Sequence, residues 1–225
     1  MNEQKGHDNL QSLESTLSKG EQFVEKNQKK LTIAVLAILA VVGLYIAYQR
    51  FYKNPREEKA LSQMFVAEQY FGLDSFKLAV NGDGNYPGFL DVIKDYGSTK
   101  AGNLAKYYLG VSYVKLKDYD KAIKYLEDFS SSDKMLAPIA LGNLGDAYAE
   151  KGDMQKAVKY YEEAASKSKN EFTSPVYLMK AGRVYENQKN WTKALETYEL
   201  VQTNYKKTTE GRVIEKFITR VKLSM

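Results

Sequence analysis

Cysteine is absent from the 225 residues, and histidine occurs only once, at His7. Without cysteine the chain can form neither a disulfide nor a thiolate metal site. This absence does not assign a compartment, because reducing and oxidising locations both tolerate cysteine-free proteins. With a single histidine in the N-terminal tail, histidine-based catalysis and histidine-rich metal sites are also excluded.

Other sequence signatures of chemistry are missing as well. Gly82-Asp83-Gly84 is not followed by Gly-Lys-Ser/Thr, so it is no phosphate-binding loop. A calcium loop starting at Asn81 would need a bidentate glutamate at its twelfth position, where Val92 stands. The carboxylate pair Glu162-Glu163 falls on a solvated helix face and receives no acid–base role. We therefore predict no catalytic residue, no metal, no cofactor and no enzymatic activity; an enzyme would need a site on bound cofactor or partner atoms.

A dense basic face is lacking too. The 33 lysines and arginines outnumber the 28 acidic residues by only five. Residues 1–30 are neutral, and the basic residues of 50–59 are opposed by Glu57 and Glu58. Nucleic-acid binding needs positive charge gathered on one surface, so we predict no nucleic-acid partner.

One pattern recurs three times along the second half of the chain. In each copy a glycine that follows leucine or alanine is followed three residues later by tyrosine. An alanine then follows at a constant distance from the glycine. The glycines lie 35 and 37 residues apart, which is close to the period of the tetratricopeptide repeat, a helix–turn–helix unit. The repeated positions are Gly110, Tyr113 and Ala122, then Gly145, Tyr148 and Ala157, then Gly182, Tyr185 and Ala194.

Each copy is predicted to be a pair of antiparallel helices, A and B. In the first copy helix A covers roughly 103–115 and helix B roughly 119–129. The glycines and alanines are expected where the two helices cross, because a larger side chain there would overpack the contact by about 1–3 kcal/mol. Pro138 and Pro175 fit the first turn of a helix A, where proline is tolerated. A single hairpin cannot bury its apolar face, so neighbouring copies must stack.

The array extends beyond the three clear copies. A degenerate copy precedes them, with Ala67, Tyr70 and Ala79 aligned to Gly110, Tyr113 and Ala122. Its extra length falls in the turn-forming segment 81–88. At the other end, an apolar stripe of Val213, Ile214, Phe217, Ile218 and Val221 indicates a capping helix. We predict an all-α chain in which a transmembrane helix is followed by a tetratricopeptide-repeat α-solenoid of about four helix pairs. Its segments are a tail (1–30), a transmembrane helix (31–49), a juxtamembrane linker (50–59), and repeats at 60–97, 98–134, 135–171 and 172–207 with a cap at 208–225.

The segment Leu31 to Tyr48 contains eighteen residues without a charge. As a helix it would span about 27 Å, near the hydrocarbon thickness of a bilayer. Aromatic residues (Tyr45, Tyr48, Phe51 and Tyr52) form a belt at one end. A buried soluble helix is disfavoured because the segment is apolar on all sides. A cleaved signal peptide is disfavoured because the stretch starts late and no small-x-small site follows. Ala40, Gly43 and Ala47 share a face that could admit a partner helix.

The orientation of this span does not follow from charge, because four basic residues lie within twenty positions on either side. In the tail, Leu10, Leu13 and Leu17 share one helical face, so this segment is either a short amphipathic helix or mostly disordered.

The A helices of such an array line a concave groove. A mixed aromatic and charged wall suits an extended peptide or a partner helix, although any of these residues could simply face solvent. Some tetratricopeptide domains bind a C-terminal carboxylate with lysine, arginine and asparagine side chains on successive A helices. Asn143, Lys180 and Arg183 resemble parts of this clamp, but Tyr107 and Val111 stand where it needs lysine and asparagine. The match is incomplete, so we do not predict binding of chaperone tails. The expected groove residues are Tyr107, Tyr108, Val111, Val114, Asn143, Asp146, Glu150, Met179, Lys180, Arg183 and Glu186.

The order of tail, span and repeats, together with the Asp74-Ser75-Phe76 and 81–88 segments, resembles a family of bacterial inner-membrane tetratricopeptide proteins, most closely versions from the Bacteroidetes group. The wider family includes an ancillary subunit of the Sec translocon that works with periplasmic chaperones. The resemblance implies a cytoplasmic tail, periplasmic repeats and a non-enzymatic role in holding chaperones or exported envelope proteins at the translocon. A structural adaptor of another envelope assembly or secretion complex is the alternative.

Overall fold

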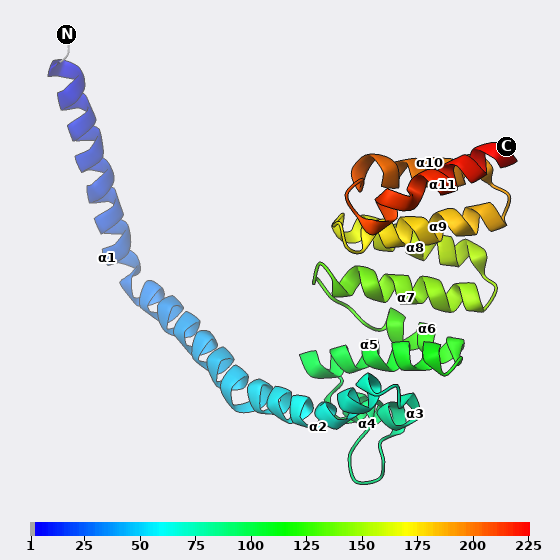
Figure 1. The fold of residues 1–225 in the computed structure, drawn as a ribbon. Helices are drawn as coiled ribbons and strands as arrows, with labels where there is room; N and C mark the ends of the chain where they lie inside the picture. Colours follow the sequence, from blue (N-terminus) through cyan, green and yellow to red (C-terminus); the bar gives the residue numbers. More distant parts are fainter. Residues whose placement is uncertain (1–2) are drawn as a thin grey trace. The chain divides into compact units, whose positions relative to one another are not determined.

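The computed structural model describes the backbone of residues 3–225 and the side chains of Glu21 and residues 23–225. The predicted amphipathic stripe of Leu10, Leu13 and Leu17 lies outside the described side chains. The regular elements of the described residues are all helical, and the chain falls into two units, divided after Pro55. Its elements are α1 (Glu3–Tyr48), the π-helical turn η1 (Gln49–Lys53), α2 (Asn54–Gly72), α3 (Phe76–Asn81), α4 (Phe89–Tyr96), α5 (Lys100–Lys115), α6 (Tyr119–Glu127), α7 (Leu136–Glu150), α8 (Met154–Ser168), α9 (Ser174–Asn187), α10 (Trp191–Asn204) and α11 (Thr209–Ser224) (Figure 1).

The first unit is dominated by the long helix α1. Its apolar side chains between Phe23 and Tyr48 are exposed, among them Ile33 at 68 % and Leu44 at 73 %. Within the described residues, one helical run, Phe23–Gly72, is long and apolar enough to cross a membrane, with a mean hydropathy of 2.5 in its most apolar window. Residues 50–59, expected as a linker, are helical, because η1 leads directly into α2.

The second unit is a stack of helices that follow one another from α5 to α11 (Figure 1). The pairs α5–α6, α7–α8 and α9–α10 are the three helix hairpins that the repeats predict. In each hairpin the repeated glycine of helix A leaves room for one large side chain of helix B. A Cβ on Gly145 would lie 2.5 Å from the Tyr161 ring, and one on Gly182 would lie 2.3 Å from the Tyr198 ring. The predicted packing role of these glycines is confirmed.

A polar contact also joins consecutive hairpins. The Tyr148 hydroxyl donates to Glu127 Oε1 on the preceding α6 at 3.0 Å. The Tyr185 hydroxyl donates in the same way to Glu162 Oε1 on α8 at 2.6 Å. Burial is the main cause that raises the pKa of both tyrosines, and the hydrogen bond to a carboxylate adds to it. The repeated tyrosine is thus a fastener between copies as well as a packing residue.

The turn inside each hairpin has the same geometry in all three copies. One residue of each turn has a left-handed backbone conformation, with φ of 62° at Lys117, 85° at Gly152 and 56° at Lys189. The next residue then donates its N–H to the tyrosine carbonyl five positions earlier, at 2.9 Å in each case. Only one of the three positions carries the glycine that such a helix end favours.

The degenerate first copy is built from α2, α3 and α4. Ala67 and Ala79 are completely buried, as their alignment with Gly110 and Ala122 predicts. Glu57 on α2 anchors the next repeat, because its carboxylate accepts from the N–H groups of Lys100 and Ala101 at the start of α5, at 2.8 and 2.7 Å.

The insertion between α3 and α4 is a tight loop. The Asp83 carboxylate accepts from the N–H groups of Asn85 and Tyr86 and from the Tyr70 hydroxyl. These bonds lower the pKa of Asp83, the Tyr70 bond most. At Gly82, φ is 77° and a Cβ would lie 2.3 Å from the Tyr86 carbonyl oxygen, so the turn requires glycine.

Helix α11 closes the far end, and four of its five predicted apolar residues are buried. Val213 is the exception at 40 % exposure, so the stripe is narrower than expected. α11 also begins like α5. Thr99 and Thr208 each accept an N–H from the glycine three residues later and donate to the carbonyl of the tyrosine three residues earlier.

Candidate functional site

The expected groove residues of α5 lie mostly inside the stack. The Tyr108 ring stacks on Phe89 with ring centroids 5.3 Å apart, and Tyr107 packs against Phe129. Val111 is 8 % exposed and Val114 is half-buried. Phe71 and Phe89 of the degenerate copy contact the Tyr108 ring. Val111 belongs to the hydrophobic core, and Tyr107, Tyr108 and Val114 pack against that core. Val111 therefore does not line an open groove wall.

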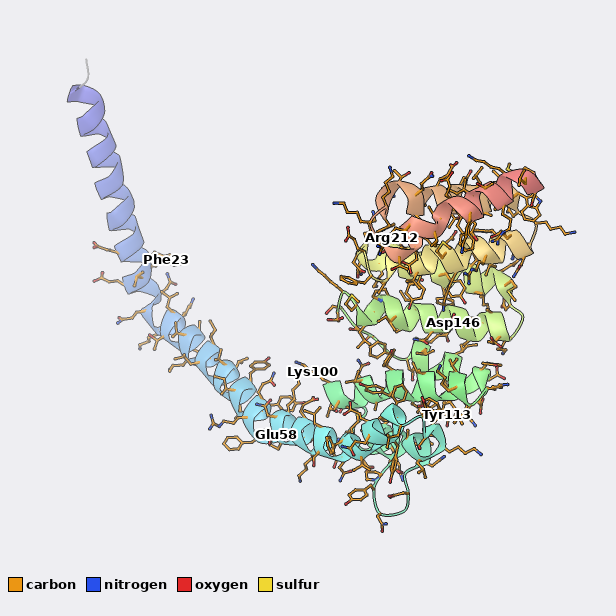
Figure 2. The ribbon with its side chains drawn as sticks, viewed as in Figure 1. Phe23, Glu58, Lys100, Tyr113, Asp146 and Arg212 are labelled. Atoms are coloured by element: carbon orange, nitrogen blue, oxygen red, sulfur yellow. The ribbon has the colours of Figure 1, made fainter. Side chains whose placement is uncertain are left out.

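The middle of the array carries a charged contact between copies, around Asp146 on α7 (Figure 2). Lys180 on α9 donates to both carboxylate oxygens, at 2.6 and 2.8 Å. The Tyr161 hydroxyl donates to the same carboxylate at 2.7 Å. The Lys180 ammonium also lies 5.5 Å from the centre of the Tyr161 ring. The structure thus brings two predicted site residues together, but it uses each to hold the other.

Of the two remaining predicted residues of α7, Asn143 makes a contact within its own helix and Glu150 makes one with the preceding hairpin. The Asn143 amide donates to the Ile139 carbonyl one turn earlier at 2.9 Å. Glu150 accepts from the Tyr119 hydroxyl at 3.2 Å. Among the described residues, no hydrogen bond or ion pair joins either side chain to Lys180 or Arg183.

An open charged site lies between α9 and α11. Arg220 donates through Nε and Nη2 to the two carboxylate oxygens of Glu186, at 2.8 and 2.7 Å. Glu186 also accepts from the Tyr198 hydroxyl of α10. The pKa of Tyr198 is raised, first by burial and then by this bond, which keeps the phenol a donor. Glu186 is therefore fixed from two sides and is 12 % exposed as a side chain.

Three cations surround the ring of Phe217 on α11. Arg183, Lys216 and Arg220 place their charged groups 5.6, 5.0 and 4.8 Å from its centroid. Cations within about 6 Å of an aromatic ring are attracted to its face. Among the described residues, neither Arg183 nor Lys216 has a carboxylate within ion-pair distance. These two side chains are exposed.

Two adjoining depressions open at this cluster. One has a volume of about 280 Å³ and reaches the buried Met179. The other has a volume of about 610 Å³. They share Arg183, Lys216 and Phe217. The first is lined by Val176, Met179, Lys180, Arg183, Thr209, Glu210, Val213, Lys216 and Phe217, and the second by Arg183, Glu186, Asn187, Lys216, Phe217 and Arg220.

Sequence reasoning missed the contribution of α11. It assigned Phe217 to the capping stripe and gave Lys216 and Arg220 no site role. The available signal was their spacing, because residues four apart on a helix lie on one face and here they flank an aromatic residue. The packing of α11 against α9 could not be read from the repeat frame.

The proposed transmembrane contact face remains a prediction. Gly43 has no neighbouring side chain within 4 Å of where a Cβ would stand, and Ala40 and Ala47 are exposed. In the part of the chain with described side chains, no group of three or more histidine, cysteine or acidic residues could hold a metal ion.

Comparison with known families supports the repeat assignment. Two models, each described as a tetratricopeptide repeat, match residues 107–172 and 177–208. The hairpins are tetratricopeptide repeats. Among solved structures, a Podosopora anserina protein assigned as a kinesin light chain with nearly identical TPR-like repeats, and a single-residue variant of it, share the fold with a TM-score of 0.57. Each is 15 % identical to this chain, and the similarity covers 75 % of this chain and 87 % of that one.

No curated protein matches the sequence. The tetratricopeptide repeats and the structural likeness therefore establish the architecture, an all-α solenoid with one long apolar helix near its start. Repeats of this kind bind proteins, so the array is a protein-interaction scaffold.

Proposed function

We propose that this protein is a membrane-tethered, non-enzymatic scaffold that holds a segment of a partner protein against the A-helix side of its repeats. The observation that carries this proposal is the open charged cluster between α9 and α11. It combines exposed cations with an exposed aliphatic side chain, Val213. Four of its lining residues were expected in the groove: Met179, Lys180, Arg183 and Glu186. Such a surface offers hydrogen bonds and apolar contact to a polypeptide without offering reactive groups.

The tether is the apolar part of α1. A run of exposed aliphatic side chains would be costly in water, and burial in lipid removes that cost at about 25 cal/mol per Å² of apolar surface. The aromatic residues near its end, with Tyr48 and Tyr52 stacked 5.3 Å apart, suit a membrane interface. In this proposal residues 31–49 span a bacterial inner membrane, with residues 1–30 in the cytoplasm and the repeats in the periplasm.

The resemblance to the ancillary Sec-translocon family favours translocon subunits, periplasmic chaperones or exported envelope proteins as partners. Ala40, Gly43 and Ala47 would contact a partner helix in the membrane.

Site-directed photo-crosslinking in native membranes tests the scaffold. A photoreactive residue at Asn187, beside the cluster, should give protein adducts, whereas the same residue at Glu163 on α8, outside both depressions, should not. Mass spectrometry of the adducts then identifies the partner. Absence of adducts at Asn187 would overturn the groove assignment, and adducts that contain no translocon, chaperone or exported protein would overturn the Sec assignment.

A reporter fused after Met225 tests the topology. A periplasmic reporter signal is expected. A cytoplasmic signal would reverse the orientation of the span and remove periplasmic partners from consideration.

A further inference from the structure

The cluster between α9 and α11 has an excess of positive charge that the protein itself does not neutralise. Its lining includes four cations (Lys180, Arg183, Lys216 and Arg220) and two carboxylates (Glu186 and Glu210). Arg220 forms an ion pair with Glu186, and Lys180 forms one with Asp146 of α7. Arg183 and Lys216 have no carboxylate within ion-pair distance among the described residues, and Glu210 is the one other carboxylate of the lining, so a net positive charge remains for a ligand.

The geometry directs these two cations to one place. They come from different helices, α9 and α11, and both lie within 6 Å of the Phe217 ring centroid. Phe217 is 6 % exposed, so its ring is held firmly by the core and fixes where the cations gather. The Glu186–Arg220 pair further limits the relative movement of α9 and α11, because two hydrogen bonds join the two side chains. A carboxylate entering here would meet two cations at little additional ordering cost.

We infer that this cluster binds an acidic side chain of the partner segment, with Arg183 and Lys216 as its ligands. This inference rests on the proposed scaffold function and adds the chemistry of the partner: an extended polypeptide with aspartate or glutamate at the α9–α11 position. The exposed Val213 beside Lys216 offers a contact for a neighbouring apolar residue of the same segment. Arginine suits this role because its planar donors can bind a carboxylate through two parallel hydrogen bonds.

The test uses the full chain in detergent and fluorescently labelled polyglutamate, with polyglutamine and polylysine of equal length as control peptides. Fluorescence anisotropy should show binding of polyglutamate alone, weakening as salt is added. The Arg183→Gln/Lys216→Gln variant should bind polyglutamate about tenfold more weakly, as expected for the loss of two exposed charge contacts. Both side chains are exposed, so the variant should retain its helical circular-dichroism spectrum and melting temperature.

A matched variant, Lys207→Gln/Lys222→Gln, removes the same net charge from exposed positions outside both depressions and should bind like the native chain. An equal loss of affinity in both variants would reduce the effect to overall charge and overturn the site. Unchanged binding by the Arg183/Lys216 variant would overturn it as well.

Two further outcomes separate this inference from the scaffold itself. If polyglutamate does not bind while Asn187 still forms protein adducts in membranes, the acidic partner is refuted and the scaffold stands. If the double variant instead loses attachment to phosphatidylglycerol vesicles that the native repeats bind, the cluster recognises lipid headgroups and the inference is again refuted.

Discussion

The left-handed residue in each hairpin turn leads to a quantitative prediction about stability. Lys117 and Lys189 occupy positions with φ near 60° in the first and third hairpin turns, where the second turn has Gly152. All three residues are exposed. We expect Lys117→Gly and Lys189→Gly to stabilise the array, and Gly152→Ala to destabilise it. In this conformation a Cβ atom lies too close to the following carbonyl oxygen, and glycine has no Cβ.

The magnitude follows from two opposing terms. A left-handed conformation costs a residue with a Cβ about 1–2 kcal/mol. Glycine gives back about 0.5–1 kcal/mol through the larger entropy of its unfolded chain. Each lysine-to-glycine change should therefore stabilise by about 0.5–1 kcal/mol, or about 1–4 °C in melting temperature for a domain of this size. The two sites lie two copies apart and share no partner, so the double variant should show the sum.

Urea unfolding followed by circular dichroism measures the effect, with the midpoint shifting and the slope unchanged. Lys115→Gly is the matched control, because Lys115 is an exposed residue of helix α5 only two positions away. There, at the last residue of the helix, the same change should destabilise by up to about 0.5 kcal/mol. Opposite signs at 115 and 117 are required by the argument; the same sign at both positions would refute it.

Three further predictions concern the contacts between copies. Tyr148→Phe and Tyr185→Phe should each lower the free energy of unfolding by about 1 kcal/mol, since each removes a hydrogen bond to a carboxylate of the preceding hairpin. Urea midpoints equal to that of the native chain would contradict this role of the tyrosines. The pKa of both tyrosines is raised in the folded chain. Their contribution to stability is therefore fully present below about pH 10, the ordinary tyrosine pKa, and is lost as the pH rises through the pKa of the folded state. The free energy of unfolding of the double phenylalanine variant should fall less steeply above pH 10 than that of the native chain, and an equal fall in both proteins would count against this. Glu57→Gln should destabilise by about 0.5–2 kcal/mol through weaker capping of α5, whereas Glu58→Gln, at an exposed neighbour, should leave the melting temperature unchanged, and equal effects of the two changes would exclude the cap.

Much of the fold follows from local sequence rules. The repeated glycines and alanines give the helix crossings because only small residues fit there, and the structure confirms this at Gly145 and Gly182. Aspartate and asparagine before each helix B cap it as expected of such residues, for example Asp118 accepting from the Lys121 N–H. These features depend on neighbours within one hairpin, so the repeat frame contains the necessary information.

The site was less predictable because it depends on contacts between distant segments. Whether Tyr108 lines a groove or a core is decided by Phe71 and Phe89 of the degenerate copy, which contact its ring. The freedom of Lys180 is decided by Asp146, one repeat away. The cluster at Phe217 requires the packing of α11 on α9, and no repeat period predicts that contact.

The shared start of α5 and α11 has a consequence for how this protein could grow. The same threonine and glycine joint precedes the three full hairpins and follows them. A block of residues 100–208 therefore begins after one such joint and ends at another. Duplicating that block in tandem would recreate a junction the chain already contains. The array, and with it the surface of the scaffold, can therefore lengthen by whole blocks, because each added block would begin with a helix start that the chain already uses.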